Sequence, residues 1–141
     1  MIKKKSCCGV GVGLLISLTV LLLTSCFQGY VGSEGEVLKK YMPPEQLKVL
    51  VDNPNDSFWI VDVRPSSAYL KGHIPTAKSF PSSEILSRLD EIPKAQYLIM
   101  YCETGGRAQS VIKNLEKQGY MRLMNWGGMS RWPYELAKGA E

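Results

Sequence analysis

The residue types best suited to chemistry lie together in one short stretch, residues 101–108, which contains Cys102 and an arginine five positions later. A cysteine thiolate is a strong nucleophile and forms covalent intermediates readily. Two glycines after it allow a loop to curl tightly with its N–H groups turned inward. We therefore predict Cys102 as the catalytic nucleophile and a substrate-binding loop made of Glu103, Thr104, Gly105, Gly106 and Arg107.

The flanking sequence predicts how this loop is positioned. Residues 97–101 form an apolar run typical of a strand buried on both faces, and residues 108–118 carry apolar side chains at helical spacing. In open α/β sheets, ligands bind beyond the carboxyl ends of the strands, which is where Cys102 falls. The helix N-terminus and Arg107 would both favour a thiolate at Cys102.

Other segments of the same kinds predict the fold class. Residues 58–63 and, more weakly, 121–125 resemble buried strands, while 44–51 and 82–89 carry helical patterns. Gly119 is placed to end the helix predicted over 108–118. Strands that alternate with helices indicate one α/β domain with a mainly parallel central sheet flanked by helices.

The N-terminal segment reads as a secretion signal and not as part of that domain. Lys3, Lys4 and Lys5 precede fifteen uncharged, strongly apolar residues, which fall short of the roughly 20 that a membrane-spanning helix needs. The following Leu-Thr-Ser-Cys sequence, which ends at Cys26, resembles the bacterial lipobox. That resemblance implies lipidation at Cys26, palmitate among the added chains, and removal of residues 1–25; a plain cleaved signal is the alternative.

This interpretation divides the chain into three parts. Residues 1–25 are the lipoprotein signal peptide, 26–36 the lipidated cysteine and a glycine-rich flexible tether, and 37–141 the folded domain. The expected location is the periplasm or the outer face of a bacterial membrane, with the protein attached through its lipid. Cys7 and Cys8 would leave with the signal, so Cys102 would be the free thiol of the mature protein.

Charge and composition argue against several other kinds of function. The chain has 17 basic and 13 acidic residues, and removal of the three signal lysines leaves a nearly neutral protein. Neutrality without a basic cluster argues against nucleic-acid binding. A single histidine, His73, and one free cysteine form no metal-ligand cluster, so we predict no metal and no cofactor.

Four ordered motifs now reveal a family resemblance. They are Asp-Val-Arg at 62–64, Gly-His-Ile-Pro-x-Ala at 72–77, Cys-x-x-Gly-x-Arg at 102–107, and Trp-Gly-Gly-x-x-x-Trp at 126–132. Together they resemble the rhodanese-family sulfurtransferases over residues 37–138. The combination of export with a single domain is similar to the periplasmic, phage-shock-type rhodaneses.

The resemblance implies a double displacement at Cys102. The thiolate takes a sulfane sulfur from thiosulfate or a persulfide and passes it, from a Cys102 persulfide, to cyanide, a thiol or a protein acceptor. Asp62 and Arg64, which flank a strand end, are predicted to brace loops. Their role would be structural, or would support the residues that contact the substrate. His73, in its Gly-His-Ile-Pro turn, is expected to be structural also.

Two alternatives to sulfur transfer stay open, and the sequence departs from the family pattern in several places, of which two bear on the site. Cysteine phosphatases of related fold use Cys-x-x-x-x-x-Arg, one residue longer than the loop here, which disfavours phosphatase activity. A non-catalytic rhodanese-like regulatory module is the other alternative, although such modules commonly lack the cysteine. Ala68 replaces a usual Glu, which predicts a missing partner for Arg64, and Glu103 would oppose an anionic donor.

Overall fold

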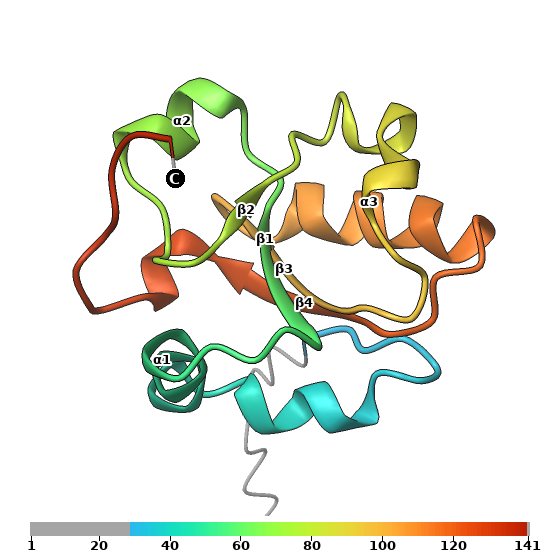
Figure 1. The fold of residues 1–141 in the computed structure, drawn as a ribbon, viewed down its shortest axis with the longest axis horizontal. Helices are drawn as coiled ribbons and strands as arrows, with labels where there is room; N and C mark the ends of the chain where they lie inside the picture. Colours follow the sequence, from blue (N-terminus) through green and yellow to red (C-terminus); the bar gives the residue numbers. More distant parts are fainter. Residues whose placement is uncertain (1–28, 141) are drawn as a thin grey trace, which may run out of the picture.

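The strands form one parallel sheet, with helices on both faces (Figure 1). The structure is a computed structural model and describes residues 29–140. The strands are β1 (Phe58–Asp62), β2 (Lys78–Ser79), β3 (Tyr97–Cys102) and β4 (Leu123–Gly128), in the spatial order β2-β1-β3-β4. The predicted α/β class, with a parallel central sheet flanked by helices, is confirmed.

The two central strands determine where the functional residues lie. The β1–β3 pairing runs from Phe58 opposite Tyr97 to Asp62 opposite Tyr101. Most residues of both strands are buried, as their unbroken apolar sequence requires. Because the strands are parallel and in this register, Asp62 and Cys102 both lie at the carboxyl ends of the strands.

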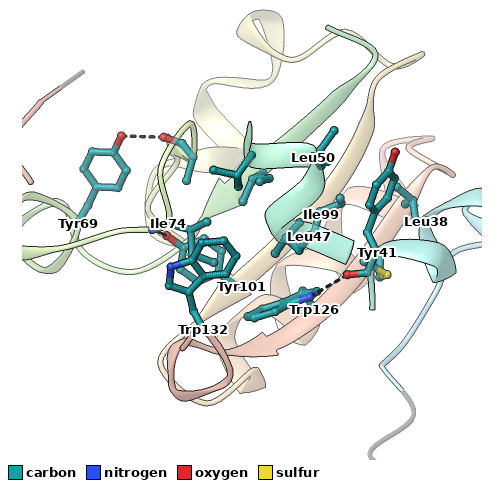
Figure 2. Packing of buried hydrophobic residues seen from close by; sticks show 14 residues of the cluster. Leu38, Tyr41, Leu47, Leu50, Tyr69, Ile74, Ile99, Tyr101, Trp126 and Trp132 are labelled. Carbon is teal, nitrogen blue, oxygen red and sulfur yellow. Dashed lines mark hydrogen bonds between the residues drawn. The ribbon is translucent and has the colours of Figure 1, made fainter. Parts of the chain in front are cut away.

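One face of the sheet is covered by the 3-10 helix η1 (Glu36–Tyr41) and by α1 (Pro44–Asp52). Pro44 begins α1 at a position where its missing N–H costs nothing and its fixed φ suits a helix. Leu47 and Leu50 then face the sheet, where they join the aromatic cluster drawn in Figure 2. In that cluster the indole N–H of Trp126 donates to the carbonyl of Tyr41 over 3.0 Å.

The opposite face is covered by α3 (Gly106–Lys117). Its side chains at helical spacing, Ala108, Val111, Ile112 and Leu115, are buried together with Cys102. The helix ends where Gly119 adopts a φ of 86°, as its sequence predicted. Within residues 29–140, no helix is long and apolar enough to cross a membrane.

The helix predicted over residues 82–89 is wrong. This segment forms two short 3-10 helices, η2 (Ile85–Ser87) and η3 (Leu89–Glu91). The hydroxyl of Ser87 donates to the carbonyl of Glu84, a local bond that competes with a regular helix. Pro93 disfavours a helical conformation at Ile92, and the side chains of Ile85 and Ile92 are buried.

The short elements between the motifs went unpredicted because they carry too few residues for periodicity. They are α2 (Ser66–Lys71), β2 and η4 (Met129–Arg131). The strand expected over 121–125 begins and ends later, as β4, and includes both glycines of the Trp-Gly-Gly motif. Close packing of Gly128 against the loop that follows β3, described below, accounts for a glycine at that position of the strand.

The flexible tether predicted for residues 26–36 is corrected over its described part. Residues 29–35, which we call the N-terminal strap, lie along the free edge of β4. Val31 forms an antiparallel bridge with Met124. The N–H groups of Gly32 and Glu34 donate to the carbonyl oxygens of Leu123 and Met121, respectively. Backbone hydrogen bonds thus attach the strap to the domain. Cys26 and residues 1–25 lie outside the described residues.

Candidate active site

Cys102 is the last residue of β3, and its side chain is buried. The backbone N–H of Gly105 donates a hydrogen bond to Sγ of Cys102 over 3.1 Å. Gly105 is the N-cap of α3 and has a φ of 95°, a conformation that glycine adopts without a steric penalty. The loop therefore turns an amide donor toward the sulfur of Cys102.

The loop is held against the neighbouring strand by a close approach at Gly128. Gly128 is opposite Cys102 in the sheet. A Cβ atom at this position would lie 2.7 Å from the carbonyl oxygen of Glu103 and 3.1 Å from Cα of Thr104. Only a glycine lets the loop lie this close, which gives the Trp-Gly-Gly motif a direct role in shaping the site.

Asp62 and Arg64 form a buried ion pair at the carboxyl end of β1, beside the loop. The two side chains approach to 2.7 Å, and Arg64 also donates to the carbonyl oxygen of Gly72 over 2.6 Å. Burial opposes the guanidinium charge, but the hydrogen bonds and charge of Asp62 outweigh it, and the pKa of Arg64 lies above its usual value. The pair connects β1 to the Gly-His-Ile-Pro segment, in agreement with a bracing function.

Glu103 connects this ion pair to the active-site loop. Its carboxylate lies 3.6 Å from Nη1 of Arg64, and its side chain is exposed whereas that of Arg64 is buried. Ala68 led us to expect that Arg64 lacks a partner, and this prediction is wrong. The guanidinium group contacts Asp62, Gly72 and Glu103.

Two hollows flank the loop. One, of about 440 Å³, is lined by Glu103, Thr104, Gly128, Ser130 and Arg131. The other, of about 270 Å³, is lined by residues of the strap, the loop, α3 and β4: Gly29, Tyr30, Thr104, Gly105, Gly106, Gln109 and Asn125. Arg107 lies in the first turn of α3, is exposed and lines neither hollow, so its predicted contact with substrate stays a prediction.

His73 is buried and packs against Tyr69. Its Nδ1 lies 2.9 Å from the carbonyl oxygen of Tyr69, and its ring stacks on the Tyr69 ring with a centroid distance of 3.7 Å. These contacts agree with the structural role expected for it. Across residues 29–140, no three His, Cys, Asp or Glu side chains gather in a way that could hold a metal ion.

Sequence reasoning missed Asn125, whose side-chain amide donates to the carbonyl of Gly105 over 3.1 Å. The signal in the sequence is an asparagine inside an apolar run, since asparagine is uncommon in strands; the structure shows that it is buried. Arg131 was missed too: it donates to the carbonyls of Trp126 and Met42 beside the larger hollow.

This site defines the class of α/β proteins with a cysteine-centred binding loop: the buried cysteine at the carboxyl end of a parallel strand accepts an amide N–H of the loop that leads into a helix. Comparison with known families identifies the family within this class. The Rhodanese-like domain family matches residues 43–134, and the chain belongs to it. The resemblance drawn from the four motifs is thereby confirmed at the level of the family.

Individual relatives agree. A sulfurtransferase of Allochromatium vinosum is 36% identical over 74 residues, which cover 52% of this chain and 69% of that protein. The putative sulfur carrier protein YrkF of Bacillus subtilis is 32% identical over 89 residues, 62% of this chain and only 48% of its own length. These relatives support sulfur transfer as the general activity.

Solved structures give the same fold. The crystal structure of a rhodanese-like domain protein from Staphylococcus aureus aligns with a TM-score of 0.60 at 30% identity, covering 69% of this chain and 95% of that one. An Escherichia coli structure described as a rhodanese with anions aligns with a TM-score of 0.54 at 25% identity, over 58% and 99% of the two chains.

Proposed function

We propose that this protein transfers sulfane sulfur through a persulfide on Cys102. The observation that carries the proposal is the hydrogen bond from the N–H of Gly105 to Sγ of Cys102, 3.1 Å long. Such a donor stabilises the thiolate that attacks and the terminal sulfur that forms. The first half-reaction forms an S–S bond from the Cys102 thiolate to the outer sulfur of a donor. With thiosulfate, the donor's own S–S bond breaks and sulfite leaves with the electron pair.

The second half-reaction restores the thiolate. A nucleophilic acceptor attacks the outer sulfur of the persulfide, and the Cys102 sulfur leaves as thiolate. Cyanide would leave as thiocyanate, and a thiol would leave as a new persulfide. No net redox change falls on the protein, so this cycle uses no cofactor. A thiol on a protein would act as acceptor in the same way.

Intact-mass spectrometry tests this proposal directly. Purified protein is incubated with thiosulfate, and the expected product carries one additional sulfur atom that cyanide removes. Cys102→Ser is the matched control, because it changes one buried atom and leaves the other cysteines in place. If neither thiosulfate nor a low-molecular-weight persulfide loads Cys102, and no aryl phosphate is hydrolysed, the binding-module alternative is favoured. Hydrolysis of an aryl phosphate without sulfur loading would favour the phosphatase alternative.

We also propose that the protein is an exported lipoprotein anchored through Cys26. The proposal rests on the basic and apolar residues before Leu-Thr-Ser-Cys. Gly29 is the first residue that the structure describes, and two residues separate it from Cys26 in the sequence. An extended chain spans at most about 3.6 Å per residue, so Gly29 would lie within about 11 Å of the lipidated residue.

Labelling with a palmitate analogue in a bacterial host tests the anchor. The label is expected on the processed protein when the full-length sequence is expressed, and Cys26→Ala should lose both the label and membrane association. Cys102→Ser serves as the control that keeps both. Labelling that survives Cys26→Ala would refute this assignment.

A further inference from the structure

Asn125 is a buried polar residue in the middle of β4, and its side-chain amide is engaged on both sides. Nδ2 donates to the carbonyl of Gly105 and to Oε1 of Gln109, each over 3.1 Å. Oδ1 accepts the backbone N–H of Gly127 over 3.0 Å. The amide orientation is settled by its neighbours, since the N–H of Gly127 can only donate and the carbonyl of Gly105 can only accept.

The bond to Gly105 matters because of what the other side of Gly105 does. The N–H of this residue donates to Sγ of Cys102, while its carbonyl accepts from Asn125 and from the N–H of Gln109. A glycine has wide backbone freedom, and here it adopts a φ of 95°. Fixing its carbonyl restricts that freedom and thereby fixes the direction of the N–H that faces the sulfur.

Asn125 is itself held in place from two directions. The register between β3 and β4 shifts between Met100 and Tyr101, so that Met100 is opposite Asn125 and Tyr101 is opposite Gly127. Irregularities of this kind redirect side chains next to active sites. From the other side, the backbone N–H of Asn125 donates to the carbonyl of Tyr30 in the strap over 2.8 Å.

We propose that Asn125 is a positioning residue for sulfur transfer: by holding the carbonyl of Gly105, it aims the Gly105 N–H at the sulfur of Cys102. It touches neither the sulfur nor the donor and acts through Gly105. The inference deepens the proposed function and rests on Cys102 being the nucleophile. It also gives the strap a part in the site, since Tyr30 supports the strand residue from which the amide projects.

Asn125→Asp is the informative variant because it is nearly isosteric. The carboxylate keeps the acceptor for the N–H of Gly127 but faces the carbonyl of Gly105 with an oxygen in place of a donor. Gln96→Glu is the matched control: the Gln96 amide also donates to a backbone carbonyl, that of Asp56, at the opposite end of the sheet. Asn125→Asp loses the two hydrogen bonds that Nδ2 donates, to Gly105 and to Gln109, whereas Gln96→Glu loses the one to Asp56; each variant gains one negative charge.

Two readouts are measured on each full-length protein. The first is the pH profile of alkylation of Cys102 by iodoacetamide, and the second is kcat and KM for thiosulfate with cyanide. Asn125→Asp is expected to move the alkylation profile toward alkaline pH and to lower kcat about tenfold or more, as loss of an oriented donor does. Gln96→Glu should leave both readouts at the values of the unmodified protein, whatever its thermal stability.

An Asn125→Asp protein that folds and keeps both the original alkylation profile and kcat overturns the proposal. If that variant fails to fold, Asn125→Ser takes its place, since it shortens the side chain without adding charge and is judged by the same readouts. Failure of the proposed function looks different. In that case the unmodified protein takes up no sulfur, while the alkylation profile still shows whether Asn125 controls the thiol.

Discussion

The carboxylate of Glu103, in the active-site loop, lies 3.6 Å from the guanidinium of Arg64, at the end of the neighbouring strand. Arg64 is already paired with Asp62 and bonded to the carbonyl of Gly72. Two carboxylates therefore share one guanidinium, and the group has a formal charge of −1. The loop is tied to the strand at the cost of a negative charge beside the nucleophile, which bears on the charge of the donor.

Replacement of Glu103 by glutamine is expected to improve the use of thiosulfate. Thiosulfate is a dianion, and removal of one nearby exposed charge should raise its kcat/KM roughly two- to tenfold at low salt. Steady-state kinetics at two ionic strengths measures this, and the gain should shrink at about 0.5 M salt as screening increases. Glu45→Gln removes an equal charge from the exposed side of α1 and should change little. A gain that is equal for both variants would contradict the local explanation.

Removal of Asp62 is expected to destabilise the fold strongly. Asp62→Ala leaves the buried guanidinium of Arg64 with the more distant Glu103 as its remaining carboxylate, and such a loss costs about 3–5 kcal/mol. The free energy of unfolding from urea titration measures the effect. Lys48→Met, which breaks the partly exposed pair with Asp52 on α1, should cost less than about 1 kcal/mol. Equal losses in the two variants would show that burial of the ion pair is unimportant.

Tyr101 should make the protein sensitive to alkaline pH. Burial and the nearby Asp62 carboxylate raise the pKa of its phenol far above the usual value of about 10, although its oxygen accepts the N–H of Ile74. The unfolded chain gives up this proton near pH 10 while the folded protein retains it. The free energy of unfolding therefore falls above pH 10, by about 1.4 kcal/mol for each pH unit.

Urea titrations between pH 9 and about 11.5 test this expectation. Tyr101→Phe should flatten the pH dependence, although the variant loses a hydrogen bond and is less stable at neutral pH. Some slope will remain, because burial also raises the pKa of Tyr120. A slope unchanged by Tyr101→Phe would assign the alkaline transition to another group.

Gly128→Ala is expected to abolish most sulfur loading. Its Cβ would meet backbone atoms of Glu103 and Thr104, which cannot rotate away, so the loop must move. A displacement of about 1 Å at a reacting centre can reduce the rate of reaction roughly 100-fold. Mass spectrometry of the thiosulfate-treated variant measures the loss. Gly106→Ala also adds a methyl group beside the loop, but its Cβ would meet only Oγ1 of Thr104, at 3.9 Å. The free energy of unfolding of this variant should therefore change by less than about 1 kcal/mol.

Much of this protein could be predicted from local patterns in the sequence. The apolar runs at 58–63 and 97–101 determined the central strands, and helical spacing determined α1 and α3, because these elements are long enough for periodicity to show. Cys102 with its glycines and the bracing pair Asp62 and Arg64 were also recognisable, since each lies within a few residues of a strand end.

What the sequence left undetermined depends on contacts between distant segments. Nothing near Asn125 in the chain shows that its amide meets Gly105, or that Glu103 turns toward Arg64. The strap read as a flexible, glycine-rich tether, yet its backbone pairs with β4. Local composition shows what a segment can do, whereas its partners are set when the sheet brings strand ends together. The tertiary structure alone therefore decided what holds the loop around Cys102.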